Sequence, residues 1–252
     1  MKLSIIIRTF NRLEYTIRSI VSIDEKSGLN RSEYEIICVD QGSTDGTIEW
    51  LNSCVEEGYY SVFPIFLKDN IGDGLGMQEG IEIATGEFIA QHDNDIELVS
   101  ENYYSRLIKL YKYFENFGWK ICAMGGQHKQ GVNRESTPWR FGKERYFKEV
   151  FGCKYFYDIP VSIDDRMHVS YPISWVTASF IFRRGFTSVP FGKGMCNSWC
   201  GDWWDRGFDN FSCETLKFWH IDSGETGAHI QKQYGKFPSY KYVFKNYRKF
   251  IK

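Results

Sequence analysis

The sequence predicts an α/β fold, a mostly parallel, Rossmann-like sheet flanked by helices. Two observations indicate this class. Short runs of apolar, β-branched residues alternate with helix-like segments through residues 1–99, and several of these runs end in a polar loop that carries carboxylates. The chain has 252 residues, of which 42% are hydrophobic, so it can bury the core of one sizeable domain or of a domain with a smaller lobe.

The first elements are expected in a regular order. Strands are expected where apolar residues run together, and helices where they recur at helical spacing. The expected strands are Leu3–Ile7, Tyr34–Val39, Val62–Leu67 and Phe88–Ala90, and the helix-like segments between them are 15–23, 48–55 and 77–84. This alternation favours a parallel sheet, because consecutive parallel strands need a crossover connection that is usually a helix.

The pattern is less regular after Ser100. Apolar residues at helical spacing predict a helix over 104–114, and further strands are expected at 120–125 and within 174–184. Residues 126–170 are polar and aromatic without a clear period. Such a segment is either a substrate-facing loop or a structural hairpin, and the sequence does not choose between them.

Two carboxylates follow the fourth strand directly, in the turn Asp93-Asn94-Asp95. Ligands of open α/β sheets bind outside the carboxyl ends of the strands, so this turn is well placed to hold a hard cation against an anionic group. The alternative is an ordinary acidic turn, since Asp and Asn are common turn residues.

Composition excludes several classes of protein. The net charge is -1, which excludes a nucleic-acid binder that works by bulk positive charge. No run of 18 apolar residues and no signal-peptide pattern occurs, so a cytoplasmic protein is expected. The seven cysteines show no paired spacing, and Cys196, Cys200 and Cys213 with His220 do not match a common zinc pattern.

Four segments occur in a characteristic order. They are residues 4–12, residues 39–47, residues 70–72 with 84–89, and the turn 93–95. In this order and spacing they resemble the nucleotide-sugar half of family 2 glycosyltransferases, although each segment by itself is weak. The resemblance implies the GT-A fold, with a nucleotide-sugar-binding half at 1–99 and an acceptor-binding, catalytic-base half at 100–235 of the same domain. Arg8 departs from the pattern, because the family usually carries proline there.

The resemblance also implies a set of donor-site residues. Mn²⁺ or Mg²⁺ would be held by Asp95, by Asp93 directly or through water, and by His220, with Mn²⁺ favoured if the imidazole binds. His220 has a second interpretation as a hydrogen-bonded core residue. The residues expected around the nucleotide diphosphate sugar are Thr9, Arg12, Asp40, Asp69, Asp73 and Asp93.

The segment Cys200–Gly207 resembles the region in which the family holds a Glu-Asp pair whose Asp is the catalytic base. Gly201 stands where the Glu would be, so Asp202 is the matching base, with Asp205 as the alternative. A second interpretation, compatible with the first, is that Asp202 caps the N-terminus of a helix.

The implied reaction is an inverting, metal-dependent sugar transfer from a nucleotide diphosphate to a hydroxyl of a carbohydrate or lipid-linked acceptor, in cell-surface glycan or polysaccharide synthesis. A sugar-nucleotide nucleotidyltransferase and a non-catalytic carbohydrate-binding protein are the alternatives, since fold by itself does not choose. Residues 236–252 predict a basic amphipathic helix. This helix either packs on the domain or makes a peripheral contact with the inner face of a membrane.

Overall fold

The computed structural model describes residues 1–128, 159–173, 176, 178–188 and 195–221. The basic helix expected at 236–252 lies outside these residues. The strands are β1 (Leu3–Thr9), β2 (Tyr34–Asp40), β3 (Val62–Phe66), β4 (Phe88–Asp93), β5 (Ile96–Leu98), β6 (Ile121–His128), β7 (Ile159–Ile163), β8 (Arg166–Ile173), β9 (Ser179–Arg183) and β10 (Asp209–His220). The helices are α1 (Leu13–Lys26), α2 (Thr47–Glu57), α3 (Asp73–Ile83), α4 (Tyr103–Asn116), α6 (Met195–Asp205) and the 3₁₀ helix η3 (Arg184–Ser188).

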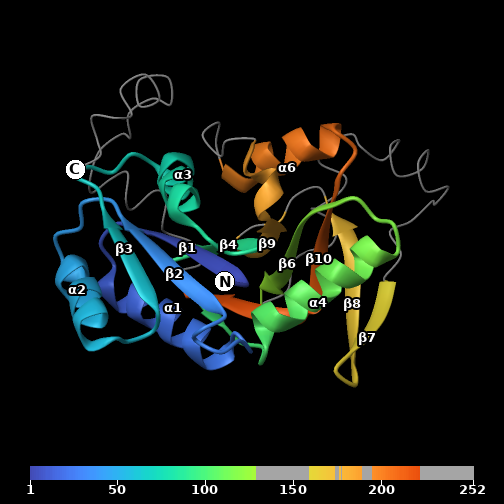
Figure 1. Cartoon of the computed structure of the whole chain (residues 1–252), viewed down its shortest axis with the longest axis horizontal. Helices are drawn as coiled ribbons and strands as arrows, with labels where there is room; N and C mark the ends of the chain where they lie inside the picture. The colour runs from blue at the N-terminus through green and yellow to red at the C-terminus, as the bar shows by residue number, and fades with distance from the viewer. Residues whose placement is uncertain (129–158, 174–175, 177, 189–194, 222–252) are drawn as a thin grey trace.

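All the strands described belong to one sheet, in the order β3-β2-β1-β4-β9-β6-β10-β8-β7, with β5 paired to β10 (Figure 1). The block β3-β2-β1-β4 is parallel, as the alternation of strands and helices predicts. In the other block β10 runs parallel to β6, whereas β9, β8, β7 and β5 run antiparallel to their neighbours. The expected α/β sheet flanked by helices is therefore confirmed.

The register of the parallel block places polar residues at one edge. Thr9 pairs with Asp40 on β2, and Arg8 pairs with Asp93 on β4. The apolar residues before them are buried, because both faces of β1 are covered by helices. The carboxyl ends of β1, β2 and β4 are consequently level with one another.

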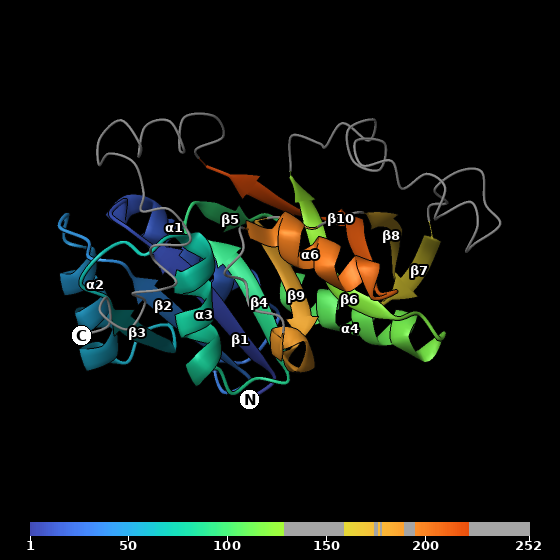
Figure 2. The same cartoon turned by 90° about the horizontal axis from the view of Figure 1, so that it is seen from above.

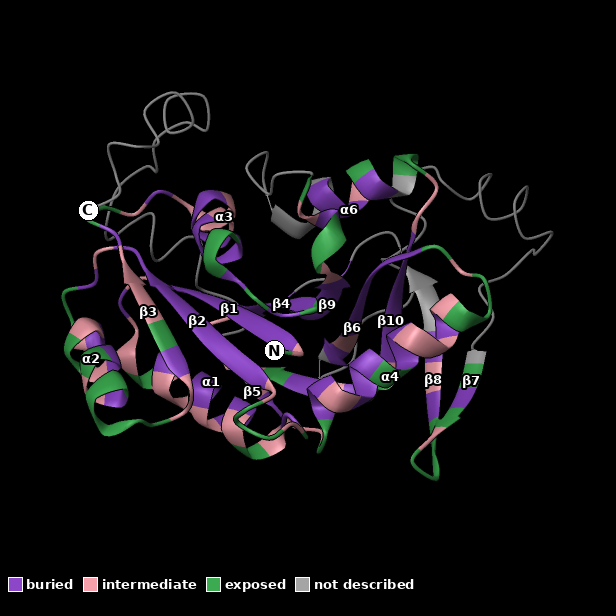
Figure 3. Cartoon of the chain, in the orientation of Figure 1, coloured by how far each residue is buried: buried purple, intermediate pink, exposed green. Residues whose placement is uncertain are grey.

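Helices cover both faces of the sheet (Figure 2). On one face α1, α2 and α4 pack against a hydrophobic cluster whose helical members include Ile20, Leu51, Leu107 and Tyr111. On the other face α3 and α6 pack on a second cluster with Leu75, Met77, Trp199 and Trp203. Figure 3 shows the central strands buried between these two layers. None of the helices in the described ranges is long and apolar enough to cross a membrane.

Part of the irregular segment is a hairpin, because β7 and β8 pair antiparallel from Ile159 to Ser170. For these residues the structural alternative is confirmed, while 129–158 lies outside the described ranges. The sequence reasoning missed β10, whose first five residues are buried whether they are apolar or polar. The sequence of β10 alternates at Phe211-Ser212-Cys213 and again at Leu216-Lys217-Phe218, but the phase shifts by one residue between the two stretches.

Candidate functional site

The centre of the candidate site is the turn between β4 and β5. Asn94, its middle residue, donates from Nδ2 to the hydroxyls of Thr9, at 3.4 Å, and Thr16, at 3.3 Å. Thr9 is buried and also hydrogen-bonds Thr16, at 3.0 Å between the two oxygens. Thr9, expected beside the nucleotide, thus contacts the turn from the side of β1 and α1.

His92 supports the same turn from within the core. Its Nε2 lies 3.2 Å from the carbonyl oxygen of Ile96, and its Nδ1 lies 2.7 Å from the hydroxyl of Tyr104. Burial lowers the pKa of His92 to about 3, so the ring is neutral. Because a carbonyl can only accept, Nε2 carries the proton, and Nδ1 accepts from the hydroxyl of Tyr104 or from that of Ser179, which lies 3.1 Å away. The ring therefore links the two ends of the turn, a role that the sequence reasoning missed.

His220 reaches the turn through the pairing of two strands. β5 runs antiparallel to the end of β10, with His220 opposite Ile96. The backbone N–H of Ile221 donates to the carbonyl of Asp95 at 2.8 Å. This pairing places His220 Nε2 at 3.5 Å from Asp95 Oδ1.

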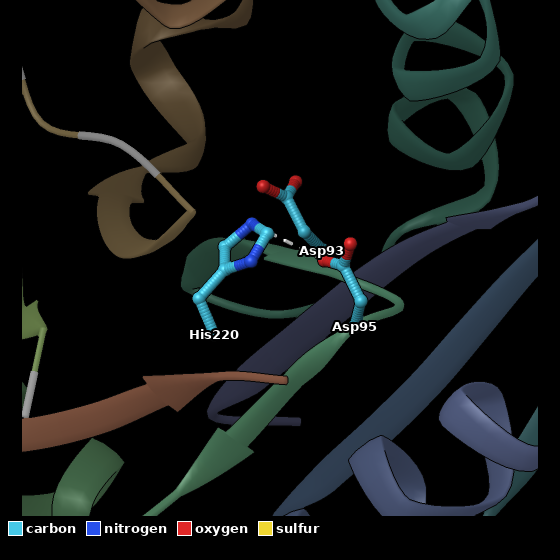
Figure 4. A group of neighbouring side chains, drawn as sticks. All are labelled: Asp93, Asp95 and His220. Carbon is cyan, nitrogen blue, oxygen red and sulfur yellow. Dashed lines mark ion pairs between the residues drawn. The ribbon is translucent and has the colours of Figure 1, made fainter. Parts of the chain in front are cut away.

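Asp93, Asp95 and His220 point toward one another (Figure 4), and each offers a ligand atom within 4.8 Å of the others. The side chain of Asp95 is 8% exposed, that of His220 19% and that of Asp93 27%. Two carboxylates and an imidazole form a donor set that suits Mn²⁺, and Mg²⁺ through the oxygens. The residues present therefore fit a divalent cation.

Two arginines on and just after β1 neutralise these carboxylates. Arg8 donates to Asp93 Oδ1 at 2.6 Å, and Arg12 donates to Asp95 Oδ2 at 2.9 Å. Burial raises the pKa of Asp93, the neighbouring charges of Asp73 and Asp95 raise it further, and Arg8 opposes them. Arg12 was expected in the nucleotide pocket, and in this structure it contacts the acidic turn. The sequence marked Arg8 only as a departure from a motif.

Asp40 is a buried carboxylate at the end of β2. Its Oδ1 accepts from the backbone N–H groups of Gly42 and Ser43, both at 3.0 Å. Its Oδ2 has no hydrogen-bond partner among the described residues. Burial raises the pKa of Asp40, and the hydrogen bonds to the following loop oppose that shift. A buried acceptor without a partner costs free energy and marks a position where a ligand can donate.

The other two expected nucleotide-site carboxylates lie at the start of α3 and before it. Asp73 is in the first turn of α3 and accepts from Arg8 Nε at 2.5 Å. Asp69 is exposed, in the loop that follows β3. The loop after Asp40 touches this segment closely, because a Cβ on Gly42, whose φ is +88°, would lie 2.7 Å from the carbonyl oxygen of Lys68. The structure therefore brings Asp69 next to the Asp40 loop.

Asp202 and Asp205 lie on α6, on the same face of the sheet as α3. Capping of the helix N-terminus by Asp202 is wrong, because α6 begins at Met195 and Asp202 lies well inside it. Trp199 and Trp203 point inward, four residues apart, so both aspartates are exposed on the outer side. Trp203 packs edge-on against Phe186, with ring centroids 4.6 Å apart, and is part of the core.

The sequence profile of glycosyl transferase family 2 matches residues 4–164, more than half of the chain. An uncharacterized glycosyltransferase of Mycoplasma genitalium, MG060, is 25% identical over 231 residues, which cover 83% of this chain and 75% of the relative. The uncharacterized glycosyltransferase YfnE of Bacillus subtilis is 30% identical over 127 residues, 49% of this chain. The match spans only 30% of the length of YfnE.

Among solved structures, the mannosyltransferase PcManGT of Pyrobaculum calidifontis, in complex with GDP-Man and Mn²⁺, superposes with a TM-score of 0.62. The identity is 16%, and the alignment covers 92% of this chain and 59% of the mannosyltransferase. At this identity the likeness shows the fold, which is GT-A.

Proposed function

The chain belongs to glycosyl transferase family 2, and from this premise we propose that it transfers a sugar from a nucleotide diphosphate sugar to an acceptor hydroxyl. One observation carries the proposal. The level ends of β1, β2 and β4 bring the buried Asp40 to the same sheet edge as the group Asp93, Asp95 and His220. A nucleotide diphosphate matches this arrangement. Its base can donate hydrogen bonds to Asp40, and its anionic diphosphate can share a cation with the group Asp93, Asp95 and His220.

Asp93, Asp95 and His220 would hold Mn²⁺ or Mg²⁺ at the diphosphate. A divalent cation supplies charge stabilisation of the leaving group as the glycosidic bond breaks. The chain contributes the orientation of the ligands: His92 and Asn94 hold the turn, and the β5–β10 pairing holds His220. The complex of PcManGT with GDP-Man and Mn²⁺ supports this chemistry for a protein of the same fold.

The nucleotide would lie along the edge between Asp40 and the acidic turn. Oδ2 of Asp40 would accept from the base, which would satisfy the buried oxygen. Thr9 and Arg12 would border the same pocket. Asp69, in the loop after β3, and Asp73, in the first turn of α3, would lie beside it. Arg12 lies 2.9 Å from Asp95 and can also meet the negative charge of a bound diphosphate.

The acceptor hydroxyl needs a base as its oxygen attacks the anomeric carbon. Asp202 is the proposed base and Asp205 the alternative, since both carboxylates are exposed on the face of the sheet that carries α3. A carboxylate within hydrogen-bond reach can take the proton during an oxocarbenium-like transition state. One displacement without a covalent intermediate inverts the anomeric configuration. The acceptor is proposed to be a carbohydrate or a lipid-linked glycan.

The decisive experiment is calorimetric titration of the full chain with UDP, GDP, dTDP and CDP, with and without Mn²⁺. We expect one nucleotide to bind, with Mn²⁺ required, and we expect Asp95→Ala to lose the metal-dependent part of the affinity. Asp164→Ala is the matched control, because this exposed aspartate lies in the turn of the β7–β8 hairpin and pairs there with Lys109 of α4. If no nucleotide diphosphate binds under any metal condition, the proposal is wrong.

A further inference from the structure

Arg8 is almost completely buried at the end of β1, with 4% of its side chain exposed. Its guanidinium contacts three groups from two other elements. Nε donates to Asp73 Oδ1 at 2.5 Å, Nη2 donates to Asp93 Oδ1 at 2.6 Å, and Nη1 lies 3.6 Å from the sulfur of Met77. Arg8 therefore connects the first turns of α3 with the last residue of β4.

α3 is shaped to accept this arginine. A Cβ on Gly76 would lie 3.2 Å from Arg8 Cγ and 3.2 Å from the side-chain amide of Gln41. Gln41 in turn accepts from the backbone N–H of Ile71, at 3.1 Å, in the loop before α3. The missing side chain at Gly76 thus lets α3 approach the ends of β1 and β2 closely.

The planar guanidinium fixes directions as well as charge. Its N–H donors lie in the plane of the group and point in fixed directions, so a carboxylate that accepts from Nη2 has its orientation defined. Arg8 donates to Oδ1 of Asp93 at 2.6 Å, and Gln91 donates to the same oxygen at the longer distance of 3.3 Å. Asp73, Asp93 and Asp95 also form a cluster of like charges, in which a buried guanidinium between two members offsets their repulsion.

We propose that Arg8 is a positioning residue for the divalent cation: it holds Asp93 against the start of α3 so that this carboxylate faces Asp95 and His220. The inference rests on the proposed function, because it assigns a role at the same site. Arg8 does not touch the cation. Two effects oppose each other when Arg8 is removed: the site becomes more negative, which attracts a cation, and Asp93 loses its orientation. Loss of orientation dominates, since partners of metal ligands typically contribute roughly 10- to 100-fold in affinity.

The test measures Mn²⁺ affinity by electron paramagnetic resonance, with the nucleotide diphosphate selected by calorimetry present at saturation. Arg8→Met removes the charge and the donors, and we expect Mn²⁺ to bind about 10- to 100-fold more weakly. The spectrum of the bound Mn²⁺ should change too, because one ligand has moved. Arg8→Lys should give an intermediate affinity, since an ammonium keeps the charge and lacks the rigid fork.

The matched control is Arg183→Met. Arg183 also bridges two carboxylates, those of Glu87 and Glu115, at 2.7 Å and 2.6 Å. On β9, Arg183 is the strand partner of Phe88, which lies at the other end of β4 from Asp93. Removal of the Arg183 side chain should therefore leave the Mn²⁺ affinity unchanged. Circular dichroism and thermal melting verify that each variant is folded.

Arg8→Met that is folded and binds Mn²⁺ as tightly as the wild type, or more tightly, would overturn the inference and leave the proposed function standing. If Arg8→Met does not fold, Arg8→Lys and Asp73→Ala decide, because Asp73→Ala removes the acceptor on α3 and leaves the contact between Arg8 and Asp93. Weakened binding in both supports the positioning role, and unchanged binding in both excludes it. A wild-type protein that binds no Mn²⁺ would contradict the proposed function and this inference together.

Discussion

The two ends of β4 carry the same chemistry in different surroundings. At its start Arg183 bridges Glu87 and Glu115, with 33% of the arginine side chain exposed. At its end Arg8 bridges Asp73 and Asp93 with 4% exposed. Water screens the first network, so its ion pairs contribute little to stability. In the second the arginine is shielded while Asp73 and Asp93 keep 35% and 27% of their side chains exposed, so breaking it costs hydrogen bonds to charged groups in a partly buried site. The burial of Arg8, and not the ion pairing itself, therefore makes the second network contribute more to the stability of the fold than the first.

The largest expected effect tests this contrast directly. Arg8→Met should lower the free energy of unfolding by about 2–3 kcal/mol, because Asp73 and Asp93 each lose a charged hydrogen-bond donor in a partly buried site. Arg183→Met should lower it by only about 0–1 kcal/mol. Urea unfolding followed by circular dichroism measures both at neutral pH and low salt. Equal losses in the two variants would refute the argument from burial.

A buried carboxylate without an arginine sharpens the comparison. Asp209 begins β10, is 6% exposed, and its Oδ1 has no hydrogen-bond partner in the described part of the chain. Burial raises its pKa to about 6. Since this folded-state pKa lies above the unfolded value of about 3.9, Asp209 favours folding most at low pH, and that contribution is lost as pH rises through about 6.

Asp209→Asn should therefore stabilise the protein, by about 2 kcal/mol at pH 7 to 8, and by much less at pH 4. The measurement is the free energy of unfolding across this pH range, compared between variant and wild type. A variant that is less stable than the wild type at pH 8 would mean that the charged form of Asp209 has a partner in solution.

The smallest effect concerns the space that α3 leaves for Arg8. Gly76→Ala gains about 1 kcal/mol of helix propensity but places a methyl group against Arg8 and Gln41. Because Arg8 is held at three points, it yields little, and we expect a net destabilisation of about 0.5–1 kcal/mol. In the Arg8→Met background the more flexible side chain should remove most of this penalty. A double-mutant cycle measures the coupling, and additive effects would show that Gly76 does not serve Arg8.

Local patterns in the sequence predicted the elements of the parallel block and the strands β6 and β9. These elements have apolar runs or helical periods that are visible within a window of about ten residues. The signal is weaker in β5 and β10: β5 has three residues, and the alternation of apolar and polar residues in β10 changes phase between Cys213 and Leu216. Their existence depends on the strands that they pair with.

The residues of the candidate site also fall into two groups: those that local patterns in the sequence place, and those that they do not. The sequence placed Asp40, Asp93 and Asp95 at the ends of strands, and the parallel order alone implied that these ends meet at one edge. The roles of the remaining residues came from the resemblance to a family, as with His220 and Asp202. These roles stay proposals, with the metal and nucleotide titrations as their test.

The sequence by itself determined which segments are strands and helices in the parallel block, since hydrophobic periodicity is a local property of the chain. Only the tertiary structure decided that His220 meets Asp95 and that Arg8 lies between Asp73 and Asp93, residues 65 and 85 positions away from it. Such contacts depend on the register of strands and on which charges become buried together. These properties arise from the packing of the whole domain, and no single stretch of sequence encodes them.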